Sequence, residues 1–201
     1  MTFHNYKFLI FSDLYRVTGS VRISTLLKYI FKGGAYSYIF WMRTSAFTYE
    51  KALLRYSIYP IAHIMLKHLH YKYGIAIPYK TEIDSGFRIT HSGGIVVHSQ
   101  CKIGKNFTLS QGVTLGHTNR GRRRGCPVIG NNVYVGPGAK IIGHITIGDN
   151  VAVGANCVVT KDVPDNSVIV GVPGKVISQK GSNGYIERVD YERFLHRKEE
   201  D

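Results

Sequence analysis

Aliphatic residues recur every six positions over half of this chain, and no other feature of the sequence restricts its fold as strongly. The series runs from Ile77 to Ile95, and after a two-residue slip it continues from Val97 to Leu115. A second interruption covers residues 116–128, and an unbroken series then leads to Val159. A period of six kept through fourteen registers indicates an internal structural repeat.

We interpret each hexad as a short strand followed by a corner, so that three hexads form one coil of eighteen residues. The aliphatic residue and a small or branched residue four places later point inward, and the frequent glycine after the aliphatic relaxes the turn. The sequence therefore predicts a triangular solenoid of stacked parallel strands. Residues eighteen apart should stack on one another: Gly130 on Gly148, Asn132 on Asn150, Val135 on Val153, and Gly136 on Gly154.

The solenoid is expected at residues 75–177, between two segments of different texture. Residues 1–74 are rich in aromatic and basic side chains, and apolar residues recur there at helical spacing, which predicts a helical N-terminal segment. Pro60 should kink or divide one of these helices. Residues 178–201 are highly charged and predict a short C-terminal helix that caps the solenoid or extends from it. One amphipathic stripe comprises Leu53, Leu54, Ile58, Ile61, Met65 and Leu69.

Charge and composition restrict the partners. The formal net charge is +13, which favours anionic partners such as nucleic acid, anionic lipid, an acidic glycan or a phosphorylated cofactor. The apolar stripe of the N-terminal segment fits a core or oligomer contact, and with its interleaved bases it also fits a membrane surface. No run of eighteen apolar residues predicts a spanning helix.

The cysteines and the N-terminus bear on the cellular compartment. Cys101, Cys126 and Cys157 share no CxxC spacing, so reduced thiols in a cytoplasmic protein are expected. The N-terminal sequence lacks a cleavable signal pattern, because Asp13 and Arg16 soon interrupt its apolar run. We therefore expect a cytoplasmic protein, with the inner face of the membrane as an alternative location.

Three stretches carry a resemblance to a known family. The hexads HSGGIVVHSQCKIGKNFTLSQGVTLG and VGPGAKIIGHITIGDNVAVGANCVVTKDVP, followed by GVPGKVI, resemble the left-handed β-helix acyltransferases, with serine acetyltransferases as the most similar branch. The resemblance implies a mainly β fold, namely a left-handed parallel β-helix. It also implies a homotrimer that binds acetyl-CoA in a groove between neighbouring solenoids.

The resemblance also implies a histidine general base. His91 stands at the position of that base in serine acetyltransferases, and an imidazole that titrates near pH 6.5 can accept a hydroxyl proton during attack. His117 opens the interrupting loop and is the second candidate, as base or as acceptor-binding residue. His98 and His144 are interpreted as ordinary corner residues. The spacing of these histidines argues against metal binding, so no metal is expected.

Contacts with acetyl-CoA are carried over from related sugar acetyltransferases. Lys161 and Lys175 would supply positive charge for the CoA phosphates. The basic loop around residues 119–125 could bind an anionic acceptor or CoA itself, and its alternative is a solvated loop. The expected cofactor-binding residues are Gly136, Ala139, Ala155, Thr160, Lys161 and Lys175, and the expected substrate-binding residues are Arg122, Arg123 and Arg124.

Departures from the serine acetyltransferase pattern determine the expected acceptor. Two aspartates of that family become Thr90 and Ala76, its substrate-binding arginine becomes Gly125, and its second histidine becomes Cys126. A zwitterionic amino acid requires paired charges in its pocket. We therefore predict an O-acetyltransferase acting by direct attack on a sugar hydroxyl of a bacterial capsule polysaccharide, a lipopolysaccharide or its precursor, free or lipid-linked.

Two alternatives belong to other classes. The first is serine O-acetyltransferase of cysteine biosynthesis. The second is a non-enzymatic basic solenoid that binds a membrane or nucleic acid; nucleic acid is not the expected partner. The group that orients His91 is open, with Glu82, Asp84 and a backbone carbonyl as candidates.

Overall fold

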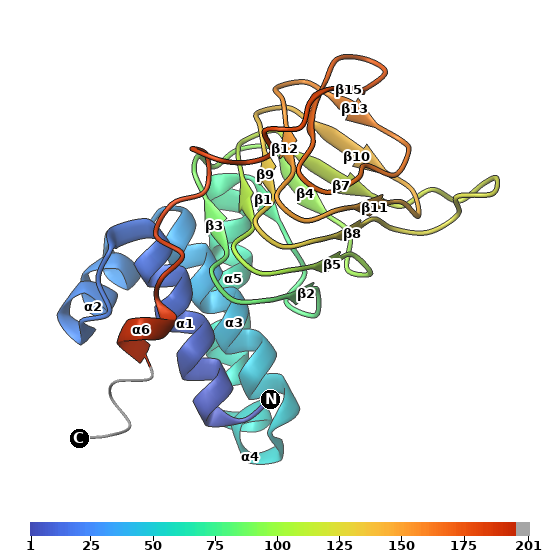
Figure 1. Ribbon diagram of the computed structural model, residues 1–201. Coiled ribbons are helices and arrows are strands. Elements are labelled where there is room, and N and C mark those ends of the chain that lie inside the picture. Colours follow the sequence, from blue (N-terminus) through green and yellow to red (C-terminus); the bar gives the residue numbers. More distant parts are fainter. Residues whose placement is uncertain (196–201) are drawn as a thin grey trace.

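The computed structural model describes residues 1–195 and shows a helical bundle at one end of a three-sided β-helix (Figure 1). Five helices precede the β-helix in the chain and one short helix follows it within the described residues, and the coils stack away from the N-terminal helices. The helices are α1 Phe3–Thr18, α2 Ile23–Lys32, α3 Ala35–Glu50, α4 Ala52–Ser57, α5 Tyr59–Tyr73 and α6 Glu192–Leu195.

Local sequence signals set the helix ends. The hydroxyl of Thr2 accepts a hydrogen bond from Asn5 N–H at the start of α1, and Gly19 ends that helix in the left-handed conformation with φ 73°. Helix α4 ends at Ser57 and α5 begins at Tyr59, with Pro60 in its first turn. The prediction that Pro60 divides the helical segment is therefore confirmed.

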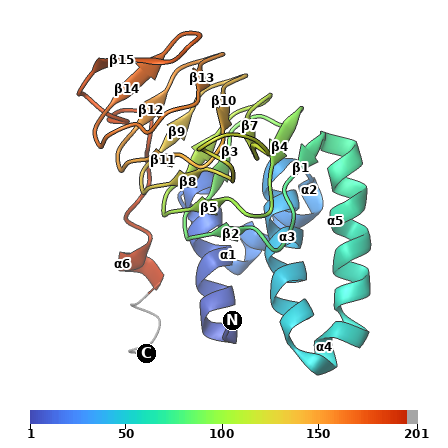
Figure 2. The same ribbon diagram turned by 90° about the vertical axis from the view of Figure 1, so that its right-hand side faces the viewer.

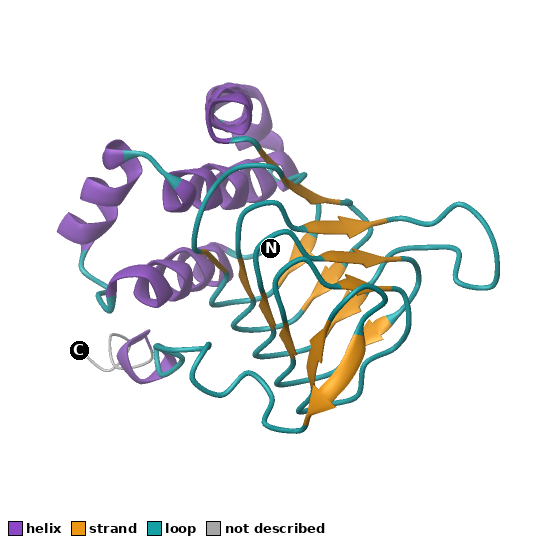
Figure 3. Cartoon of the chain, turned by 90° about the horizontal axis from the view of Figure 1, so that it is seen from above, coloured by secondary structure: helices purple, strands orange, loops and turns teal. Residues whose placement is uncertain are grey.

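Three sheets form the three faces of the prism, and all their strand pairs are parallel except β14–β15 (Figures 1 and 3). The five-stranded sheet comprises β1 Ile75–Ala76, β4 Ile95–Val97, β7 Thr114–Gly116, β10 Lys140–Ile142 and β13 Val158–Val159. The four-stranded sheet comprises β2 Glu82–Ile83, β5 Lys102–Ile103, β8 Val128–Ile129 and β11 Thr146–Ile147. The six-stranded sheet comprises β3 Arg88–Ile89, β6 Thr108–Leu109, β9 Tyr134–Val135, β12 Ala152–Val153, β14 Val168–Val170 and β15 Lys175–Ser178.

The stacking register confirms the predicted coils. Val135 pairs with Val153, and the Asn132 side chain donates to Asn150 Oδ1, eighteen residues further on. The earlier slip lengthens one coil to twenty residues, and the loop after β7 lengthens another to twenty-six. The fold is the predicted mainly β, left-handed parallel β-helix with N-terminal helices.

A ladder of asparagines follows one corner of the prism. Side-chain amides connect Asn106 to Asn132, Asn132 to Asn150, and Asn150 to Asn166, at 2.8, 3.0 and 3.1 Å. All four residues have φ between 54° and 58°, a conformation that asparagine tolerates better than most residues. The ladder therefore satisfies a steric demand and a hydrogen-bonding demand at each coil.

A polar junction joins the helices to the first coil, and the sequence pattern gave no sign of it. The Arg16 side chain is fully buried and donates to Gly86 O at 3.1 Å and to Thr108 Oγ1 at 2.6 Å. Burial lowers the pKa of Arg16 to about 10. Asp13 and Arg43 form a buried ion pair beside it. These contacts fix the bundle to the prism.

The C-terminal segment runs back along the prism to the helices. Tyr185 stacks on Tyr134 with ring centroids 4.6 Å apart, and Tyr191 is buried with its hydroxyl 3.0 Å from Ser85 Oγ. Helix α6 lies beside α1 (Figure 2). The predicted C-terminal helix is thus only four residues long within the described chain, and residues 196–201 lie outside the described residues.

The apolar stripe predicted on the second half of the bundle is mostly exposed. Leu69 is buried, but Leu53, Ile58 and Ile61 are exposed to solvent. No helix within residues 1–195 is long and apolar enough to span a membrane. The alternatives of an oligomer contact or a membrane surface therefore fit this stripe better than a core.

Candidate functional site

His91 lies on an exposed corner between the six-stranded and five-stranded sheets. The corner begins after β3 and turns through Gly93 and Gly94, whose φ values are 114° and 63°. A side chain at Gly94 would meet the backbone of Gly112 in the next coil at 3.5 Å, so glycine here allows close stacking. The imidazole is therefore presented at a corner of the prism, accessible to a ligand.

The side chains considered near His91 in the sequence have other partners. Thr90, which replaces a family aspartate, lies with its hydroxyl 2.9 Å from Ser110 Oγ. Glu82 forms an ion pair with Lys102 at 3.7 Å, and Asp84 Oδ1 accepts from Ser85 N–H. Both carboxylates are therefore occupied elsewhere, at the start of another face of the prism.

His117 lies at the other end of the strands of the five-stranded sheet, immediately after β7. Its ring is 5.2 Å from the ring of His98, and His98 Nδ1 is 3.0 Å from Cys126 Sγ. Burial raises the pKa of the Cys126 thiol, so this thiol is neutral beside the imidazole. The interpretation of His98 as an ordinary corner residue missed this cluster, because Cys126 approaches from the far end of the inserted loop.

A cavity of about 760 Å³ opens beside this cluster, between α5 and the outer face of the five-stranded sheet. Its lining is mainly apolar and aromatic with several basic groups, and none of the described lining residues is acidic. Ala76, where the family pattern has an aspartate, also lines it. The basic groups are His63, Lys67, His70, His98 and His117.

The loop after His117 is a hairpin that projects from the prism (Figures 1 and 3). Backbone hydrogen bonds of 3.0 Å in both directions between Thr118 and Gly125 close its base. Arg123 Nη1 lies 3.0 Å from both oxygens of Asp162. The Thr146 N–H and then Arg123 hold the pKa of Asp162 below its usual range. Arg123 therefore anchors the hairpin.

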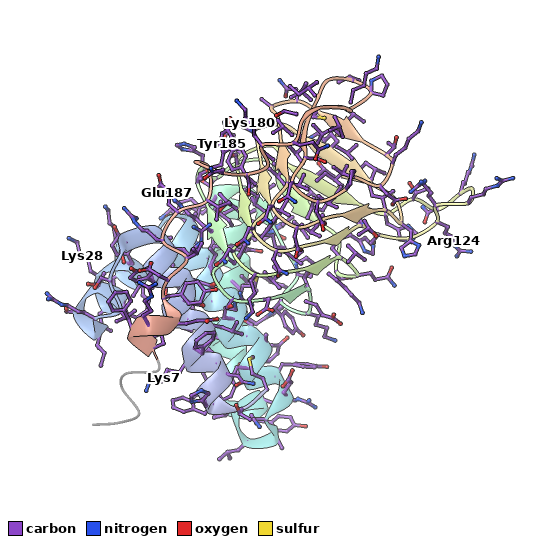
Figure 4. The ribbon with its side chains drawn as sticks, in the orientation of Figure 1. Lys7, Lys28, Arg124, Lys180, Tyr185 and Glu187 are labelled. Carbon is purple, nitrogen blue, oxygen red and sulfur yellow. The ribbon has the colours of Figure 1, made fainter. Side chains whose placement is uncertain are left out.

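The other two predicted arginines of the hairpin have different surroundings. Arg122 and Arg124 are exposed, and Arg124 points away from the prism (Figure 4). Of the three arginines predicted to bind substrate, these two remain available for an anionic ligand.

The predicted cofactor-binding residues fall into two groups. Thr160, Lys161 and Lys175 line one cleft of about 240 Å³ at the far end of the prism. Ala155 is exposed at the corner after β12, next to Gly136, which lies on the neighbouring coil. The structure thus brings the two lysines and Thr160 together.

Ala139 does not fit the predicted cofactor role. Its side chain is 0 % exposed and faces the core of the prism. Its carbonyl already accepts a hydrogen bond from Thr114 N–H. Position 139 is one of the inward small positions of the hexad, so its side chain does not support the cofactor contact, which stays a prediction.

Metal ligands do not converge in the described part of the chain. Within residues 1–195, no group of three or more His, Cys, Asp or Glu side chains has the geometry to hold a metal ion. The cluster of His98, His117 and Cys126 consists of one hydrogen bond and one tilted ring contact.

Sequence and structure comparisons support the fold and the repeat. Residues 126–161 match the family model described as bacterial transferase hexapeptide (six repeats). A serine acetyltransferase of Staphylococcus xylosus is 42% identical over 123 residues, which are 61% of this chain and 57% of that protein. This chain therefore aligns with little more than half the length of that relative.

Solved structures extend the similarity to the helices. A serine acetyltransferase of Neisseria gonorrhoeae in complex with serine has a TM-score of 0.67 and 25% identity, covering 86% of this chain and 69% of that chain. Another serine acetyltransferase, in complex with CoA, has a TM-score of 0.64 and 27% identity, covering 84% and 68%.

These relatives overturn the expected acceptor. The prediction of a polysaccharide or lipopolysaccharide sugar as acceptor is wrong, because the similar proteins are serine acetyltransferases and one of them is solved with serine bound. The lost family charges at Thr90, Ala76, Gly125 and Cys126 were overinterpreted, since a binding site can be built from other groups. The chain is therefore similar to hexapeptide-repeat transferases in its repeat, and to serine acetyltransferases in sequence and fold.

Proposed function

We propose that this protein is a serine O-acetyltransferase that uses acetyl-CoA as the acetyl donor. The observation that carries the proposal is the 42% identity to a serine acetyltransferase over 123 residues, which are 61% of this chain. The exposed position of His91 at a corner of the prism supports it as the general base.

In the proposed reaction, His91 accepts the proton of the serine hydroxyl while the hydroxyl oxygen attacks the thioester carbonyl. Backbone N–H groups of the glycine-rich corners can stabilise the resulting oxyanion. Collapse breaks the carbon–sulfur bond, and the proton on His91 passes to the leaving thiolate. The products are O-acetylserine and CoA, and no acetyl group is bound to the protein.

We further propose that the protein is a homotrimer with its site between subunits. His91 precedes strand β4 and His117 follows strand β7, so the two residues lie at opposite ends of the strands of the five-stranded sheet. A three-residue strand spans about 10 Å, so one serine molecule cannot contact both imidazoles of a single subunit. In a trimer, His91 of one subunit can face the hairpin of its neighbour.

The serine carboxylate requires a cationic partner, because the family arginine is replaced by Gly125. Arg122 and Arg124 are exposed on the hairpin and meet this requirement, whereas Arg123 is paired with Asp162. At the other end of the prism, Lys161 and Lys175 are proposed to bind the phosphates of CoA, with Thr160 beside them in the same cleft.

The test is an acetyl-transfer assay with L-serine that measures the released CoA thiol. His91→Asn should lower kcat by about 10²–10⁴-fold, the usual contribution of a general base. CoA binding and the mass of the assembly in solution should not change. The matched control is His144→Asn, a second exposed corner histidine, which should retain full activity.

Two results would contradict the proposal. Full activity of His91→Asn would remove His91 from the mechanism. Absence of serine turnover by the wild-type protein that nevertheless binds CoA would reject serine as the acceptor. His117→Asn distinguishes the second candidate, because loss of kcat there with unchanged activity of His91→Asn would transfer the role of base to His117.

A further inference from the structure

Helix α2 carries an apolar stripe on its outer face. Ile23, Leu27 and Phe31 are spaced four residues apart, so they lie on one side of the helix, and they are 64%, 49% and 84% exposed. The opposite side of α2 packs through Leu26 and Tyr29 against α1 and α3. Both faces are therefore apolar, although only one is needed to hold the helix on the bundle.

Basic residues border this stripe. Arg22, Lys28 and Lys32 are exposed, and Lys28 points outward from the helix in Figure 4. The sequence contains no acidic residue between Asp13 and Glu50. A large exposed apolar stripe with a basic border is the pattern of a helix that lies in the interface of an anionic membrane.

Charge also argues against a second copy of the same face as the occupant. An isologous contact would place the Arg22, Lys28 and Lys32 of one copy against those of the other, and like charges across an interface disfavour association. An anionic lipid surface satisfies the apolar stripe and its basic border together.

The position of α2 leaves the candidate site free. In two views, α2 lies at one end of the molecule, whereas the hairpin projects at the other (Figures 1 and 3), where Figure 4 labels Arg124. Ten residues are too few to span a bilayer, so α2 could only lie along its surface. We propose that α2 docks the protein on anionic lipid bilayers, with Ile23, Leu27 and Phe31 at the headgroup–acyl boundary.

The proposal is tested by flotation with vesicles of phosphatidylcholine alone and of phosphatidylcholine mixed with phosphatidylglycerol. The wild-type protein should float with the anionic vesicles, and added salt should weaken binding. Leu27→Ser/Phe31→Ser should lower the partition coefficient by about tenfold or more, since two large apolar side chains are lost from the interface. Lys28→Gln/Lys32→Gln should weaken binding at low salt.

The matched control is Ile61→Ser/Ile64→Ser on α5, the other exposed apolar face that fits a membrane surface, so it tests whether binding belongs to α2 or to α5. This control should bind vesicles as the wild type does. Absence of wild-type binding to anionic vesicles would overturn the proposal, and so would equal loss of binding in the control. If the mass of the assembly in sedimentation is lower for Leu27→Ser/Phe31→Ser than for the wild type, the stripe is instead a contact between copies. Serine acetylation in solution should be unchanged in all these variants, so this test is independent of the proposed reaction.

Discussion

The ion pair between Asp13 and Arg43 gives a quantitative test of how the helices are held on the β-helix. Arg43 Nε lies 3.0 Å from Asp13 Oδ2, and the two side chains are 6% and 0% exposed. Asp13 Oδ1 also accepts from Phe87 N–H at 2.7 Å. Asp13→Ala therefore leaves a buried guanidinium without its counter-charge, at a cost of about 3–5 kcal/mol. The lost acceptor for Phe87 N–H adds about 1–3 kcal/mol.

The combined loss should lower Tm by about 8 °C or more, because each kcal/mol corresponds to about 2–4 °C in a chain of this size. Thermal and urea unfolding should be compared at one protein concentration, since assembly affects apparent stability. Asp13→Asn is the control: it retains an acceptor for Phe87 N–H and removes only the charge, so its loss should be smaller. A loss below about 1 kcal/mol for Asp13→Ala, the range of an exposed pair, would refute this account of the junction.

Two further predictions concern groups with shifted pKa values. Burial, with the neighbouring Cys126 thiol, raises the pKa of Cys101 to about 12. Cys101 should therefore resist alkylation by iodoacetamide at pH 8 in the folded protein and react after unfolding. Equal rates of alkylation in both states would contradict its burial. The pKa of Asp162 is lower in the folded than in the unfolded state, so its stabilisation of the hairpin is complete above the unfolded value of about 4 and is lost as the pH falls through the folded pKa. In the wild type, the hydrogen-exchange protection of the Thr118 and Gly125 amides should fall with this loss. In Asp162→Asn, the protection should be insensitive to pH over the same range. Identical pH dependence of the protection in both proteins would contradict the Arg123–Asp162 anchor.

The repeat of the β-helix could be predicted because its information is local and periodic. A six-residue spacing of aliphatic residues fixes which side chains point inward, and stacking then places Val135 beside Val153 and Asn132 beside Asn150. Pro60 likewise divides α4 from α5 through its own backbone geometry.

The candidate site was predictable only in part. His91 was predicted as the base through a motif that surrounds it in the sequence, but the contact of His98 with His117 and Cys126 depends on a loop that returns to the prism. Arg123 looked equivalent to Arg122 until its pairing with Asp162, thirty-nine residues away, made it an anchor. Sequence spacing carries no information on such pairings.

The amino-acid sequence by itself determined the stacked coils, the placement of inward and corner residues, and the presence of helices before them, because each follows from short-range periodicity and backbone preference. Only the tertiary structure decided which face of α2 is covered, which arginine of the hairpin is paired, and how Asp13, Arg16 and Arg43 join the bundle to the prism. Those outcomes depend on contacts between segments far apart in the chain, where burial and charge pairing outweigh local pattern.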